Sequence, residues 1–229
     1  MKEKKVIIFP HAGAGIGFFN SFKDEFKKTD VFVIQYPGRE DKYEKNMPDT
    51  IDELADVIFD EYKCLFDGQF VFWGHSMGSI VAYEVAKRCE RNLNVVPIVF
   101  FSSGSSAPCC GGSERVKNAV KSHKDFEKLL DVYGGISDEL RNDRDFCEYF
   151  FPIILGDLKM ISNYCDEQLV KLRCPIMLME GLDDDVSIDR WRLYTEHKIE
   201  VDYFEGNHFF INKYKSELAK KIEKYFIDK

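Results

Sequence analysis

Residues 70–78 read FVFWGHSMG, an apolar run that ends in the pattern Gly-x-Ser-x-Gly. The apolar run predicts a buried strand, and residues 77–88 carry a helical pattern. Between a strand and a helix, this pattern forms a sharp, strained turn that holds the serine Oγ out at the carboxyl edge of a sheet. The serine also lies at the positive end of the helix. We therefore expect Ser76 to be a nucleophile rather than part of a structural glycine-rich turn.

Five further apolar runs of strand length lie on either side of this one, at residues 5–9, 31–36, 96–101, 175–180 and 199–204. Their nearly continuous hydrophobicity is typical of strands buried on both faces. Helical patterns alternate with them, and one begins with Thr50 and Glu53 at capping-box spacing. The alternation predicts an α/β protein with the α/β-hydrolase fold, in which a mostly parallel central sheet carries helices on both faces.

The stretch from residue 107 to residue 166 interrupts this rhythm because it contains helical patterns and no convincing strand. A connection between two strands does not need that length. We therefore expect a helical insertion (residues 107–166) that forms a lid within a single domain, residues 1–229. The alternative is a plain pair of crossover helices.

Composition excludes several classes of function. The chain has 229 residues and a net charge of −8, which disfavours a nucleic-acid surface. No apolar run is long enough for a membrane span or a signal peptide. The seven cysteines are scattered and include no Cys-x-x-Cys pair, so we expect neither disulfides nor a metal site. A cytoplasmic monomer is the expectation.

A serine nucleophile needs a base and an acid, which follow it in the order Ser, Asp or Glu, His in this fold. Of the histidines after Ser76, only His208 directly follows a predicted strand, the last one. The acid is expected after the preceding strand, where residues 181–185 read GLDDD. The third position after Gly181 favours Asp184, with Asp183 and Asp185 as alternatives.

Two backbone N–H groups are expected to form an oxyanion hole. Met77 supplies one, directly after the nucleophile, and Ala12 supplies the other from the small-residue loop after the first strand. The alternative, a nucleotide-binding loop, is disfavoured because residues 13–17 lack the G-x-G-x-x-G spacing and no P-loop lysine follows.

Several segments together resemble the type II thioesterases, which edit nonribosomal peptide and polyketide synthesis. They are FPHAGA (9–14), QYPGR (35–39), GHSMG (74–78), GLDD (181–184) and GNHF (206–209). The vertebrate medium-chain fatty-acyl thioesterases are close relatives of this family. The resemblance implies hydrolysis of acyl groups carried on 4′-phosphopantetheine by acyl or peptidyl carrier proteins, with transient contacts and no cofactor of the enzyme's own. It departs near Pro152, where the family usually shows Pro-x-x-Arg-Ala-Asp and this chain has PIILGD.

Within the insertion, we expect five apolar side chains to line an acyl pocket: Phe126, Leu129, Leu130, Phe150 and Phe151. Packing within the insertion itself is the alternative. Four lysines at helical spacing (Lys117, Lys121, Lys124 and Lys128) would form one basic face for a carrier protein, unless a cap at Ser122 splits the stretch into two helices. Other possible functions are a carboxylesterase or peptidase acting on small molecules, a fatty-acyl carrier-protein thioesterase, and a non-catalytic binding protein.

Overall fold

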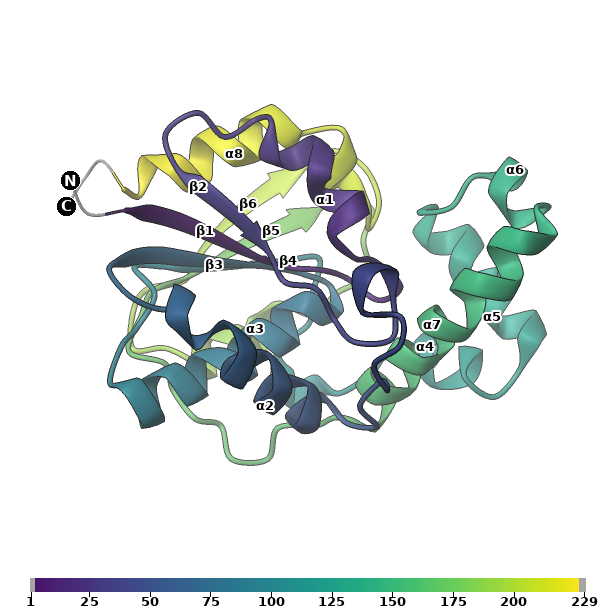
Figure 1. The fold of residues 1–229 in the computed structure, drawn as a ribbon, viewed down its shortest axis with the longest axis horizontal. Helices are drawn as coiled ribbons and strands as arrows, with labels where there is room; N and C mark the ends of the chain where they lie inside the picture. Colours follow the sequence, from purple (N-terminus) through teal and green to yellow (C-terminus); the bar gives the residue numbers. More distant parts are fainter. Residues whose placement is uncertain (1–2, 227–229) are drawn as a thin grey trace.

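Six parallel strands form a single sheet in the computed structural model, which describes residues 3–226 (Figure 1). Their order across the sheet is β2-β1-β3-β4-β5-β6. The strands are β1 (Lys4–Phe9), β2 (Asp30–Val33), β3 (Gln69–His75), β4 (Phe100–Ser103), β5 (Ile176–Gly181) and β6 (Glu200–Phe204). Since all six run in the same direction, their carboxyl ends meet at one edge, where loops from different parts of the chain can form a site.

Helices cover both faces of this sheet. On one face lie α1 (Ile16–Lys23) and α8 (Lys215–Lys224), and on the other lie α2 (Ile51–Tyr62) and α3 (Met77–Arg88) (Figure 1). The capping box predicted at the start of α2 is present, with reciprocal bonds between Thr50 and Glu53. The predicted fold class, a parallel sheet with helices on both faces, is confirmed.

The fourth strand is shorter than predicted and begins at Phe100 instead of residue 96. Pro97 explains the difference, because proline has no N–H to donate and restricts the residue before it. The chain still approaches β3 here, since Ile98 N–H donates to Phe70 O at 2.8 Å. The apolar pattern therefore marks the right segment but not the residue at which regular pairing starts.

Four helices lie between β4 and β5: α4 (Glu114–Ala119), α5 (His123–Tyr133), α6 (Asp138–Arg141) and α7 (Arg144–Asn163). Figure 1 shows them in teal and green beyond the carboxyl edge of the sheet. A side-chain oxygen caps each helix start, supplied by Ser113, Ser122, Ser137 and Asp143. The apolar faces of α4, α5 and α7 form a cluster of their own, separate from the two clusters that flank the sheet.

The expected basic face on this insertion is not formed. Ser122 accepts the N–H of Asp125 and begins α5, so the four lysines lie on two helices and the turn between them. Lys117 is paired with Glu114 at 3.2 Å, and Lys128 is paired with Asp125 at 2.8 Å. The alternative reading of this stretch, two helices separated by a cap, is confirmed.

No disulfide joins any of the seven cysteines, all of which lie within residues 3–226. Over residues 3–226, no helix has both the length and the apolar composition that a membrane crossing requires.

Candidate active site

The turn after β3 places Ser76 in a strained conformation. Its φ is +56° and its ψ is −123°, a region that side chains with a Cβ rarely occupy. The N–H of Ser76 donates to Ser103 O at 2.8 Å, which fixes the turn to the neighbouring strand. Close packing requires the flanking glycines: a Cβ at Gly78 would lie 2.0 Å from Phe9 O. The sequence pattern and the backbone strain both describe a nucleophile elbow.

Three side chains from the carboxyl ends of β3, β5 and β6 meet in one hydrogen-bonded row. His208 Nε2 lies 2.9 Å from Ser76 Oγ, and His208 Nδ1 lies 2.7 Å from Asp184 Oδ2. Because a carboxylate only accepts, Nδ1 carries the proton and Nε2 is free to accept from the serine hydroxyl. Asp183 and Asp185 do not bond to His208, and Asp185 instead pairs with Arg115 at 3.3 Å. The structure thus brings together Ser76, Asp184 and His208, the three residues expected from the sequence.

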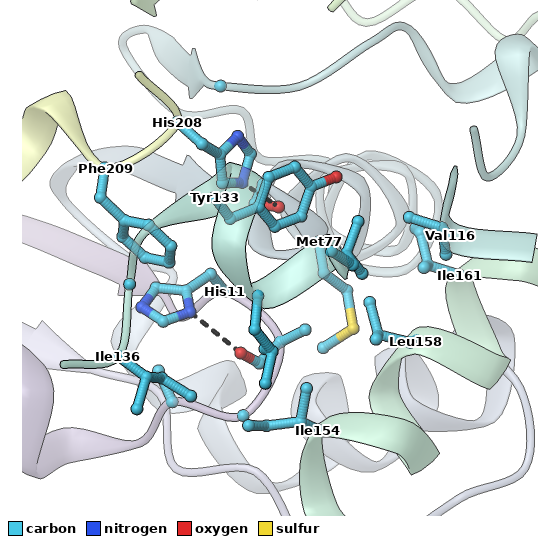
Figure 2. Close-up of a pocket in the computed structure, with 18 of the residues that line it drawn as sticks. His11, Met77, Val116, Tyr133, Ile136, Ile154, Leu158, Ile161, His208 and Phe209 are labelled. Atoms are coloured by element: carbon cyan, nitrogen blue, oxygen red, sulfur yellow. Dashed lines mark hydrogen bonds between the residues drawn. The ribbon is translucent and has the colours of Figure 1, made fainter. Parts of the chain in front are cut away.

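A tyrosine of the insertion covers the imidazole of His208. Tyr133, at the end of α5, stacks on this ring with 4.2 Å between centroids and 18° between planes. Figure 2 shows the two rings lying against each other at one end of the cavity. Asp184 holds the edge of the imidazole through Nδ1, and Tyr133 packs against its face, so the two contacts restrain different motions of the ring. No local sequence pattern indicates this contact, because Tyr133 belongs to a helix that lies 75 residues before the histidine in the chain.

The residues expected to form the oxyanion hole, Ala12 and Met77, both line the cavity beside Ser76. Met77 is the first residue of α3, so its N–H has no partner within the helix and is available to a ligand. Ala12 lies in the loop after β1, where the ring of His11 donates from Nδ1 to Ala12 O at 3.0 Å (Figure 2).

The cavity above Ser76 has a volume of about 440 Å³, within the range of small-molecule sites. Side chains of α3 and of the insertion give it a largely apolar wall: Met77, Ile80, Val116, Ile154, Leu158 and Ile161. Leu129, Leu130 and Phe150 line it as expected from the sequence. Phe126 and Phe151 do not. Their rings pack edge to face inside the insertion, with 5.1 Å between centroids, so for these two residues packing within the insertion replaces the expected place in the acyl pocket.

Buried titratable groups around the triad are held neutral. Burial lowers the pKa of His11 to about 3 and lowers the pKa of His75 well below its usual range, with the charge of His208 as a further cause for both. Burial, and then the charge of Asp184, raises the pKa of Glu180 to about 9. At neutral pH these three buried side chains therefore carry no charge.

A buried ion pair beside the site was not predicted from the sequence. Arg39 and Asp157 form a two-pronged pair with both N–O distances at 2.6 Å, and both side chains are buried. A signal existed for each partner separately, because Arg39 ends the QYPGR segment and Asp157 is the acid retained after Pro152. Their separation of 118 residues hid the contact.

This chain is similar to known thioesterases in sequence and in fold. A family model described as "Thioesterase domain" matches residues 4–226. TesA of Mycobacterium marinum, a thioesterase, is 33% identical over 229 residues that cover 94% of this chain and 88% of TesA. RedJ, a thioesterase from the prodiginine pathway of Streptomyces coelicolor, superposes with a TM-score of 0.86 at 25% identity, covering 96% of this chain and 85% of RedJ.

Other relatives are much longer proteins. Phenyloxazoline synthase MbtB of Mycobacterium tuberculosis is 29% identical over 230 residues that cover 96% of this chain. The chain spans only 16% of that synthase.

Proposed function

We propose that this chain, which belongs to the thioesterase family, hydrolyses acyl thioesters of 4′-phosphopantetheine on carrier proteins. This reaction would free acyl or peptidyl carrier proteins in nonribosomal peptide or polyketide synthesis. The observation that carries this proposal is the hydrogen-bonded row of Ser76, His208 and Asp184 at the floor of an apolar cavity. The row supplies the chemistry, and the cavity suits an acyl chain.

In the proposed mechanism, Ser76 Oγ attacks the thioester carbonyl while its proton passes to His208 Nε2. Asp184 keeps the imidazole in the correct tautomer and stabilises the imidazolium. The N–H groups of Ala12 and Met77 bind the oxyanion of the tetrahedral intermediate. As this intermediate collapses, the carbon–sulfur bond breaks and His208 returns the proton to the thiolate. Water then attacks the acyl-enzyme with His208 again as base, releasing the acid and free Ser76.

The cavity favours this reading over a peptidase or a general carboxylesterase. Its wall is mainly aliphatic and aromatic, which suits an acyl chain better than a peptide backbone. A thiol, with a pKa of about 8.5, also leaves far more readily than an amine. A fatty-acyl carrier-protein thioesterase would use the same chemistry and remains the alternative within the family.

Recognition of the carrier protein is expected to be local and transient, because this chain carries a net charge of −8. Since the predicted lysine face is split, we assign no docking role to it.

The test compares three substrates that share one acyl group: a loaded carrier protein, the N-acetylcysteamine thioester and the p-nitrophenyl ester. We expect kcat/KM to be highest for the carrier protein and lowest for the ester. A peptidyl carrier domain and a fatty-acid carrier protein, each loaded with that group, distinguish the two thioesterase alternatives. Preference for the ester would refute the proposal.

Ser76→Ala should lower kcat by at least about 10³-fold while the protein stays folded. Ser102→Ala is the matched control, since Ser102 is also buried near the site and its Oγ makes no hydrogen bond to any residue of the described part. Near-normal hydrolysis by a folded Ser76→Ala protein would contradict the serine mechanism.

A further inference from the structure

We propose that the buried ion pair of Arg39 and Asp157 positions the oxyanion loop (residues 10–15), so that Ala12 presents its N–H to the developing oxyanion. This inference rests on the proposed function, because it concerns the same site. It assigns a role to two residues that touch neither substrate nor the triad. They are positioning residues, which act through the backbone of the loop.

Each partner bonds to the loop as well as to the other partner. Asp157 Oδ2 accepts the N–H of Gly13 at 2.7 Å, and Arg39 Nη1 donates to Ala14 O at 3.1 Å. Asp157 has no exposed surface and Arg39 is 2% exposed. A charge pair so shielded from water is strong and geometrically specific, because a guanidinium and a carboxylate meet in one plane.

The peptide unit between Ala12 and Gly13 is thereby held at both ends. Its carbonyl accepts from His11 Nδ1, and its N–H donates to Asp157 Oδ2. A peptide plane fixed at both its donor and its acceptor cannot rotate without breaking a buried hydrogen bond. The plane that carries the N–H of Ala12 is the preceding one in the chain, and its carbonyl, His11 O, accepts the N–H of Ala14 at 3.1 Å, so its direction is restrained too.

The QYPGR segment (35–39) therefore positions the oxyanion loop, a role that its sequence pattern does not indicate. Besides Arg39, it supplies Tyr36, whose hydroxyl donates to Pro10 O at 3.0 Å. Tyr36 and Arg39 thus form hydrogen bonds to the oxyanion loop near its two ends, at Pro10 O and at Ala14 O. The segment itself contributes nothing to the triad.

The pair also ties the loop to the insertion, because Asp157 lies on α7. Gly13 has a φ of +80°, and a Cβ there would lie 2.4 Å from Ile154 Cγ1 of the same helix. The helix therefore packs directly on the loop backbone. A competing role follows from this contact: the pair could serve only to anchor α7. That role predicts a changed acyl pocket with an unchanged oxyanion hole.

The decisive variant is Arg39→Met/Asp157→Leu, which removes both charges together and replaces them with apolar side chains of similar length. Replacing a buried pair in this way is often neutral for stability, whereas removing one partner leaves a lone buried charge. The readouts are kcat and KM for a thioester, and Ki for an alkyl trifluoromethyl ketone whose adduct with Ser76 places an oxyanion in the hole. The ketone needs no thioester turnover, so failure of the proposed function and failure of this inference are distinguishable.

We expect kcat to fall about 10²-fold and Ki for the ketone to rise in parallel, with KM within threefold, as for loss of an oxyanion donor. Arg39→Met/Asp157→Asn should recover at least tenfold of both losses, because the asparagine oxygen can still accept from Gly13 N–H. Glu84→Gln is the control, since it removes the charge of a buried acid that pairs with Lys87 and Arg88 on α3, away from the loop.

Unchanged kcat and Ki in the folded double variant, with an altered KM or chain-length preference, would assign the pair to anchoring α7 alone and overturn the proposal. A second measurement needs no variant. In the wild-type protein, the amide of Gly13 should exchange slowly with solvent, because it donates a hydrogen bond to the buried Asp157. Fast exchange of this amide would equally refute the proposal.

Discussion

Replacing Glu180 by glutamine should change how stability depends on pH, because this residue is a buried acid beside the triad. Glu180 lies near the end of β5 and is 2% exposed. Neither carboxyl oxygen forms a hydrogen bond within residues 3–226, although the amides of Gly104 and Ser105 lie close enough to favour the charged form slightly. Burial, reinforced by the charge of Asp184, raises its pKa from 4.5 to about 9. Glu180 is therefore protonated in the folded protein at neutral pH.

The sign of the effect follows from proton binding. Between pH 4.5 and pH 9 the folded state holds a proton on Glu180 that the unfolded state has released, so stability falls as pH rises through this window. Each pH unit is equivalent to about 1.4 kcal/mol per proton. From pH 5 to pH 8 the folded protein should thus lose about 4 kcal/mol of stability through this group alone, or roughly 10 °C in Tm for a chain of this size.

Glu180→Gln removes that proton while keeping the shape of the neutral side chain. Its difference from wild type in the free energy of unfolding should grow by about 4 kcal/mol, in favour of the variant, from pH 5 to pH 8. Urea unfolding at several pH values measures this slope, and any fixed cost of the unpartnered amide cancels from it. Glu167→Gln, at an exposed acid, is the control and should show a flat difference. A flat difference for Glu180→Gln too would show that Glu180 is ionised in the folded state.

Two further predictions concern the triad and the cavity. Asp184→Asn should reduce kcat by about 10³-fold or more, because it removes the carboxylate 2.7 Å from His208 Nδ1, whereas Asp183→Asn should cost less than about tenfold. A crippling Asp183→Asn variant would contradict the assignment. Leu158→Trp should shorten the longest acyl chain that is hydrolysed efficiently, since Leu158 lines the cavity on α7. A kcat/KM series over thioesters of increasing chain length checks this, and an unchanged profile would count against the cavity as the acyl site.

The three residues of the hydrogen-bonded row, Ser76, His208 and Asp184, were predictable because each follows a strand at a fixed place. Strand β3 leads into Ser76 through a pattern that is visible in nine residues, and the last strand leads into His208. Asp184 required only a count from Gly181. The carboxyl ends of parallel strands meet at one edge, so correct strands place these side chains together without knowledge of distances. The resemblance to type II thioesterases is confirmed by the family match and by related structures.

The side chains of the insertion were less predictable because its helices have two kinds of apolar neighbour. On α5, Phe126 turns toward the interior of the insertion while Leu129 and Leu130 reach the cavity, and helical spacing alone does not distinguish these two environments. Contacts across long separations were equally hidden. Tyr133 on His208 and Arg39 on Asp157 join segments that share no local pattern.

These hidden contacts have a common origin in the insertion. Tyr133 of α5 lies against the base of the triad, and Asp157 of α7 holds the N–H of Gly13 in the oxyanion loop. In the proposed mechanism, the first contact restrains the imidazole that transfers protons, and the second restrains the loop whose N–H binds the oxyanion. A cover that only shaped the acyl pocket would need neither contact. We therefore expect a displacement of α5 or α7 to disturb His208 or the oxyanion loop as well as the wall of the cavity.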